Sequence, residues 1–157
     1  MASIWNKRCY AGDIAVDYYM GVKHKGPGGD EQQRTRDLNA VIFGDGADVN
    51  TGYTFIMGGV DGVVTSLLKN GEVVAQAPEV VVPRLYAVHH QCPRLRAEKV
   101  GHTLRLYFEG RLAIEYEDPE PIGSGYVGLW TRNSAVCVPR VTIYAESETD
   151  SRFLAAP

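Results

Sequence analysis

Short stretches in which apolar and polar residues alternate recur along most of this chain. In residues 12–23 every second position is apolar, which is the period of a β-strand with one buried face. That face carries Ile14, Val16, Tyr18, Met20 and Val22. Residues 37–44 are apolar at nearly every position, so we expect a strand that is covered on both faces.

Turn residues separate these stretches. Asn70-Gly71 is a preferred pair for a tight hairpin turn, so residues 63–76 are expected to form a hairpin. Turns at Val100-Gly101 and Glu109-Gly110 divide residues 93–118 into three strands, and further strands are expected in residues 52–59, 125–132 and 137–146. No helical period lasts three turns; the best short helix lies in residues 83–91, and residues 24–37 form a polar loop.

Composition narrows the class of protein. The chain has 157 residues, of which 45% are apolar and 22% charged, as in a soluble globular domain. A net charge of -3 without a basic block disfavours a nucleic-acid partner, and no apolar run is long enough to span a membrane. We expect one all-β domain in residues 1–147, a two-sheet antiparallel β-sandwich, and a tail in residues 148–157.

The N-terminus and the cysteines bear on the compartment. The opening MASIWNKRCY has no apolar core of a signal peptide, so we expect a cytosolic protein, or a domain cut from a longer extracellular or periplasmic chain. Cys9, Cys92 and Cys137 lack metal-type spacing. They are expected to be reduced thiols, or one disulfide and a free thiol if the parent protein is secreted.

The segments FEGRLAIEYED, GYVGLWT and VCVPRVTIYA resemble the C-terminal half of concanavalin A-like jelly rolls, most closely the laminin-G-like and 3-keto-disaccharide hydrolase-type domains. The resemblance covers Asp13–Ala145 in layout and is specific over Leu95–Tyr144. It implies a jelly-roll sandwich that binds or processes sugars on a concave sheet. Such domains usually begin with an additional strand; either Ile4–Cys9 supplies it, or the chain begins late and leaves an exposed sheet edge through which it could dimerise.

A sugar-binding groove is the first functional hypothesis. In GYVGLWTR, Tyr126, Gly128, Trp130 and Arg132 share one strand face, where an indole plate and a forked cation suit a sugar. The alternative is that Trp130 packs as a core or rim aromatic. Candidate ligand-binding residues on one shared sheet are Asp17, Tyr19, Asn39, Arg94, Arg96, Trp130 and Arg132.

Catalysis is the second hypothesis. His89 or His90, with Asp17, could act as a general base or bind a metal. Glu115 and Glu117 share a strand face, but Tyr116 fills the position where a glucanase of this fold needs aspartate. These two glutamates are therefore expected to face solvent.

The loop after residue 44 could hold Ca²⁺ through Asp45, Asp48 and Asn50, although the same residues also favour simple Asx turns. Three functions stay open from the sequence. They are a non-catalytic carbohydrate-binding module without a cofactor, a glycoside-processing enzyme acting on oxidised sugars, and a structural domain that binds another protein.

Overall fold

Antiparallel β-strands and their turns make up the part of the chain that the structure describes. This computed structural model describes residues 1–22, 38–59, 64–77, 92–132 and 135–150. Its strands are β1 (Ala2–Val22), β2 (Asn39–Gly44), β3 (Tyr53–Gly58), β4 (Val64–Lys69), β5 (Glu72–Ala77), β6 (Arg94–Val100), β7 (Thr103–Phe108), β8 (Arg111–Glu117), β9 (Ser124–Thr131) and β10 (Val136–Asp150). The expected all-β antiparallel sandwich is confirmed.

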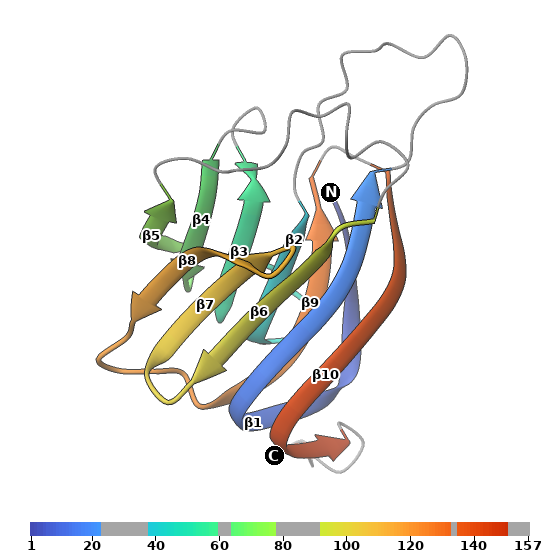
Figure 1. Cartoon of the computed structure of the whole chain (residues 1–157). Coiled ribbons are helices and arrows are strands. Elements are labelled where there is room, and N and C mark those ends of the chain that lie inside the picture. Colours follow the sequence, from blue (N-terminus) through green and yellow to red (C-terminus); the bar gives the residue numbers. More distant parts are fainter. Residues whose placement is uncertain (23–37, 60–63, 78–91, 133–134, 151–157) are drawn as a thin grey trace, which may run out of the picture.

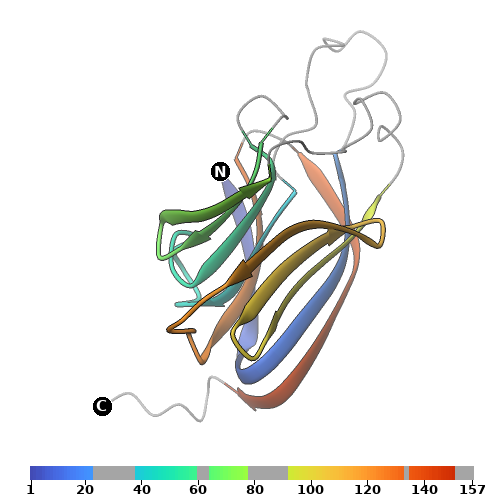
Figure 2. The ribbon, with the colours of Figure 1, turned by 60° about the vertical axis from the view of Figure 1, so that its left-hand side comes forward.

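The strands lie in two layers (Figures 1 and 2). The front sheet contains β10, the second half of β1 from Ile14 onward, β6, β7 and β8. The back sheet contains the first half of β1, β9, β2, β3, β4 and β5. Among the described strands, only β1 and the end of β10, which pairs with it, run through both layers. The bend in β1 therefore sets how the sheets stack.

Gly12 makes that bend. Its φ of 80° lies in the left-handed region that glycine adopts easily, and the β1–β10 register shifts between Ala11 and Ile14. A Cβ at Gly12 would lie 2.1 Å from Glu146 Oε2, so the Glu146 side chain would have to shift to admit a larger residue. Ala2–Ala11, N-terminal to the bend, pairs with β9, so Ile4–Cys9 does supply the additional strand that the sequence left open.

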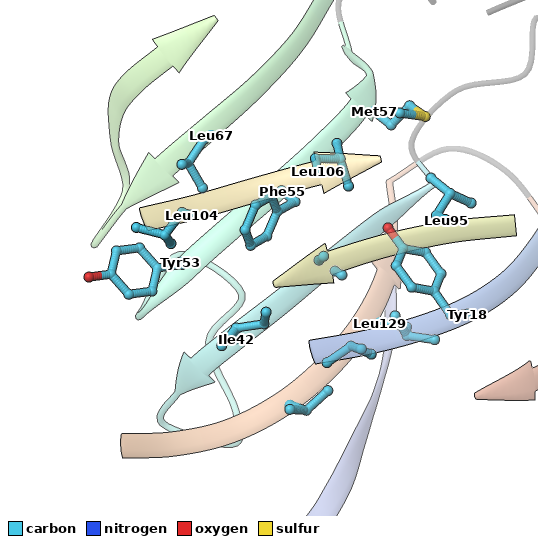
Figure 3. Close-up of a cluster of buried hydrophobic side chains, with 14 of the residues drawn as sticks. Tyr18, Ile42, Tyr53, Phe55, Met57, Leu67, Leu95, Leu104, Leu106 and Leu129 are labelled. Atoms are coloured by element: carbon cyan, nitrogen blue, oxygen red, sulfur yellow. The ribbon is translucent and has the colours of Figure 1, made fainter. Parts of the chain in front are cut away.

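The core fills the space between the sheets (Figure 3). The alternation expected for residues 12–23 is confirmed, because Ile14, Val16, Tyr18 and Met20 are all buried. They pack against Leu95 from β6 and against inward-facing residues of the other strands, which include Leu104, Leu106, Ile42, Phe55, Leu67 and Leu129. Both faces of β2 are buried, as its apolar run predicted.

The hairpins turn at or within one residue of the predicted positions. Asn70 and Gly71 both have positive φ, of 49° and 84°, between β4 and β5. The turn at Glu109-Gly110 joins β7 to β8 as predicted, whereas the turn between β6 and β7 lies at Gly101-His102, one residue later than the predicted Val100-Gly101. β10 continues to Asp150, into the segment expected to be a tail. The expected helix in residues 83–91 and the loop in residues 24–37 lie outside the described residues. Among the described residues, no helix has the length and apolarity needed to cross a membrane.

Candidate functional site

The outer face of the front sheet is polar, because the alternate residues of its strands point into the core. Antiparallel register places Asp17 opposite Arg96, and Arg96 opposite Tyr107. In the next row, Glu98 stands opposite Arg105, and Arg105 opposite Glu115. We call this surface the front polar face; its residues are Asp17, Arg94, Arg96, Glu98, Arg105, Tyr107, Glu115 and Tyr144.

Ion pairs connect the strands across this face. Asp17 Oδ2 accepts from Arg94 Nη2 at 2.8 Å and lies 3.5 Å from Arg96 Nη1. Arg96 Nε also donates to Glu98 Oε2 at 2.8 Å, so this guanidinium bridges two carboxylates. The Asp17 and Glu98 residues are each only 8% exposed, whereas the Arg94 side chain is 47% exposed. The carboxylates therefore hold the arginines in place, and the arginines reach the solvent.

The network continues toward the edge strand β8. Arg105 Nη1 lies 3.5 Å from Glu98 Oε1, and Arg105 Nε donates to Glu115 Oε2 at 2.6 Å. The Tyr107 hydroxyl donates to Glu98 Oε1 at 3.2 Å. On the other side, the Arg96 guanidinium lies 6.0 Å from the centre of the Tyr144 ring, within reach of a cation–π contact.

A pocket of about 270 Å³ opens on this face. Its lining consists of Arg94, Arg96, Glu98, Tyr107 and Gly110. Gly110 belongs to the β7–β8 turn and contributes no side chain to the pocket. Donors and acceptors thus converge on one concavity, where placed polar groups can fix the orientation of a ligand.

The electrostatics of the face favour charged arginines. The hydrogen bond with Asp17 raises the pKa of Arg94, and the hydrogen bond with Glu115 raises the pKa of Arg105. Burial works to lower the pKa of Arg96, but Glu98 and Asp17 outweigh it and raise that pKa. Burial and the nearby Glu98 charge raise the pKa of Tyr107. The tyrosine is consequently a neutral donor and acceptor at physiological pH.

The sequence expected Asn39 and Trp130 to lie on one sheet with Asp17, and the structure separates them. Asn39 and Trp130 face each other across β2 and β9 in the back sheet. Asn39 is fully buried, and its Oδ1 accepts from the Met57 backbone N–H at 3.2 Å. Trp130 is 8% exposed and packs with Val41 and Val49. This side chain occupies a small second cluster, as the packing alternative predicted.

Trp5 occupies the space beside two glycines of the back sheet, Gly44 at the end of β2 and Gly128 on β9. A Cβ at Gly128 would lie 2.7 Å from Trp5 Cε3, and one at Gly44 would lie 2.9 Å from Trp5 Cη2. The indole of Trp5 therefore lies flat against two strands of the back sheet. The room that Gly128 leaves beside Trp130 is therefore filled by a side chain from β1 and is not open to a sugar.

The remaining predicted residues are dispersed. Tyr19 is half-buried at the end of the front polar face, opposite Arg94 and Arg140. Arg132 is exposed just beyond β9 in the back sheet. His89 and His90 lie outside the described residues, so their role as a base stays a prediction. Glu115 and Glu117 are exposed, as expected for a solvated strand face.

The acidic loop after β2 forms Asx turns. Asp45 Oδ1 accepts from the backbone N–H groups of Ala47 and Asp48, both at 2.8 Å, and Asp48 Oδ1 accepts from the Asn50 backbone at 2.9 Å. The N–H groups of Asp48 and Ala47 lower the pKa of Asp45. The part of the chain that is described holds no cluster of three or more metal-ligating side chains. Calcium binding by this loop stays a prediction.

Five members of the front polar face were not among the ligand-binding candidates from the sequence: Glu98, Arg105, Tyr107, Glu115 and Tyr144. The β6–β7 turn carried the signal for Arg105 and Tyr107, because a two-residue loop at Gly101-His102 pairs Glu98 with Arg105 and Arg96 with Tyr107. Tyr144 joins the face through the long-range pairing of β1 with β10. The three cysteines are free thiols on or next to β1, β6 and β10.

No family model matches this chain, and no curated protein matches it significantly in sequence. In fold it is similar to the carbohydrate binding module CBM66 from Bacillus subtilis, with 19% identity over 91% of this chain and 81% of that chain, at a TM-score of 0.63. A protein of unknown function with a galectin-like fold from Bacillus subtilis gives 12% identity, 91% and 76% coverage, and a TM-score of 0.67. The Ca²⁺- and mannose-bound exoplasmic/lumenal domain of VIP36 has 12% identity over 91% of this chain and 72% of that chain, at a TM-score of 0.64.

The fold is a lectin-like jelly roll. At these identities the likeness is one of fold alone. Within this lectin-like jelly roll, the front polar face lies on β10, β1, β6, β7 and β8, which run side by side in Figure 1.

Proposed function

We propose that this chain is a saccharide-binding module that uses the front polar face and performs no catalysis. The observation that carries the proposal is the pocket lined by Arg94, Arg96, Glu98, Tyr107 and Gly110. Guanidinium N–H groups donate hydrogen bonds, carboxylates accept them, and the tyrosine hydroxyl does both. A sugar diol needs this mixture, because each hydroxyl also both donates and accepts.

The pocket is preorganised for such a ligand. Arg96 is fixed between Asp17 and Glu98, so little side-chain entropy is lost when a hydroxyl binds to it. Tyr107 and Tyr144 add aromatic surface on either side of Arg96, suited to the apolar C–H faces of a sugar ring. The face thus combines both kinds of contact that a saccharide offers.

The names of the structural neighbours agree with this proposal. They include a carbohydrate binding module, a mannose-bound domain of VIP36, and sheep galectin-11 in complex with glycerol, which matches at 13% identity and a TM-score of 0.54. The closer resemblance to laminin-G-like or 3-keto-disaccharide hydrolase-type domains stays a prediction. Binding to a protein partner and dimerisation through a sheet edge also stay predictions.

Binding is favoured over glycoside processing because both buried carboxylates of the face are held in arginine ion pairs. A hydrolase would need one carboxyl group to donate a proton and a second group to attack or to activate water. Asp17 and Glu98 instead form the walls that position Arg94 and Arg96.

A glycan-array screen followed by titration tests the proposal. Arg94→Gln removes an exposed donor of the pocket, and Arg132→Gln makes the same change beside β9 on the other sheet. We expect Arg94→Gln to weaken saccharide binding about tenfold or more, as for the loss of a charged hydrogen bond, and Arg132→Gln to bind like wild type. Circular dichroism checks that both variants are folded.

The opposite pattern, with binding lost in Arg132→Gln alone, would move the site to the region of Trp130. A repeat of the screen with a chelator examines the Asp45 loop, since loss of binding on chelation would make that loop a metal site. Absence of binding to every glycan on the array would refute the proposed function.

A further inference from the structure

We infer that the front polar face selects uncharged saccharides, and that Glu115 is the residue that keeps it closed to acidic ones. This inference rests on the proposed function and adds the class of ligand. It follows from how the charges of the face are paired and from which of those charges is least protected.

Charge on the face is balanced within one cluster. Its guanidinium groups belong to Arg94, Arg96 and Arg105, and its carboxylates to Asp17, Glu98 and Glu115. Each arginine lies within 4 Å of at least one of these carboxylates, and Arg96 and Arg105 each contact two. At the rim, Arg140 on β10 and Glu109 beside Arg94 add one charge of each sign. The front polar face therefore offers hydrogen bonds without a net positive charge.

An acidic saccharide would meet this cluster unfavourably. Its carboxylate or sulfate would have to share an arginine with Asp17, Glu98 or Glu115, and like charges at such short distances repel. An uncharged hydroxyl can accept from a guanidinium and donate to the adjacent carboxylate in the same pose. The three arginines alone would suggest an anion-binding site, but the carboxylates paired with them disfavour an anion.

Glu115 is the most exposed of the three carboxylates that balance the arginines. Its side chain is 51% exposed on the edge strand β8, whereas those of Asp17 and Glu98 are about 10% exposed. Arg105 donates to Glu115 at 2.6 Å, and its other carboxylate, Glu98, is shared with Arg96. Without the Glu115 charge, three guanidinium groups would face two carboxylates, and Arg105 could bind an incoming anion.

Glu117 provides a matched control on the same strand. It is also exposed, two residues further along β8, and its Oε2 accepts from the Thr103 hydroxyl at 2.9 Å. Glu117→Gln therefore changes the net charge of the protein as Glu115→Gln does, but it frees no arginine. Any difference between the two variants reports on Arg105 and not on overall charge.

The test compares wild type, Glu115→Gln and Glu117→Gln on an array of neutral glycans printed beside their sulfated and uronate-bearing counterparts. We expect wild type to bind the neutral glycans better than their acidic counterparts. In Glu115→Gln the ratio of acidic to neutral binding should rise by about threefold or more and fall again at high salt, as for an exposed ion pair. Glu117→Gln should keep the wild-type ratio.

The possible outcomes separately test the selectivity, the role of Glu115 and saccharide binding itself. A wild-type preference for acidic glycans would overturn this inference while leaving saccharide binding intact. Equal ratios in Glu115→Gln and Glu117→Gln would remove the role of Glu115. Silence of all three proteins on the array would refute the proposed function, and the inference would fall with it.

Discussion

The Tyr53 hydroxyl donates a 2.6 Å hydrogen bond to Asp118 Oδ2, and this contact joins the two sheets. Tyr53 belongs to β3 of the back sheet, and Asp118 follows β8 of the front sheet. Lys69 from β4 lies 2.9 Å from both carboxylate oxygens, and the Ile122 backbone N–H donates to the Tyr53 hydroxyl at 2.8 Å. Asp118 is 1% exposed, so these partners satisfy a charge that water does not reach.

Replacing Tyr53 by phenylalanine should destabilise the fold. The substitution keeps the buried ring but removes the donor to Asp118 and the acceptor of Ile122, which costs about 1–3 kcal/mol for buried polar groups left unpaired. Chemical denaturation of Tyr53→Phe, compared with Tyr144→Phe at an exposed position, measures the difference. Equal stabilities of the two variants would show that the hydroxyl contributes nothing.

Asp118 should make the protein sensitive to acid. Burial works to raise the pKa of Asp118, but hydrogen bonds from Lys69 and Tyr53 outweigh it and lower that pKa. A group whose pKa is lowered on folding stabilises the fold above its unfolded pKa, about 4 for aspartate, and loses this contribution as the pH falls through the folded value. Denaturation curves between neutral pH and pH 3 should show a loss that is smaller in Asp118→Asn. The same slope in both proteins would assign the acid sensitivity to other carboxylates.

Gly128→Ala should disturb the packing of Trp5. The added Cβ would lie 2.7 Å from the indole, so the ring must move, at a cost of about 1–3 kcal/mol. Gly123→Ala is the control, because nothing lies within 4 Å of a Cβ there. Denaturation and tryptophan fluorescence report the two effects, and an unchanged emission spectrum in Gly128→Ala would contradict this account of Trp5.

Leu106→Ala should be among the most damaging single changes on the front sheet. Leu106 is fully buried, and truncating it leaves a cavity that lowers the free energy of unfolding by about 2–5 kcal/mol. Leu112, on the neighbouring strand β8, is 53% exposed, so Leu112→Ala should cost far less. Comparable midpoints of thermal unfolding for the two variants would place the core elsewhere.

The strands and their buried faces were predictable because they depend on local pattern. Alternation identified the inward residues of β1, and the Asn70-Gly71 pair identified a hairpin, since both are properties of neighbouring residues. The turn at Gly101 likewise sets the pairing of Glu98 with Arg105. Asp17, Arg94 and Arg96 were also expected on one sheet, but they share it through the long-range pairing of β1 with β6, which no local turn sets.

The β-bulge between β7 and β8 was not predictable from the pattern. From the turn at Glu109-Gly110, unbroken pairing would place Arg105 opposite Ile114, but the register shifts between Leu106 and Tyr107 and brings Glu115 there instead. A shift of one residue exchanges the two faces of a strand. The bulge therefore sends Ile114 into the core and Glu115 to the front polar face.

The sequence by itself determined which residues of an unbroken strand such as the second half of β1 face inward, because strand period is local. Tertiary structure alone decided which strands share a sheet, and thus separated Trp130 from Asp17. The physical reason is the bend at Gly12, where one strand leaves the back sheet and enters the front sheet. Packing between distant segments, such as Trp5 on Gly128, then decided which polar residues stay open to a ligand.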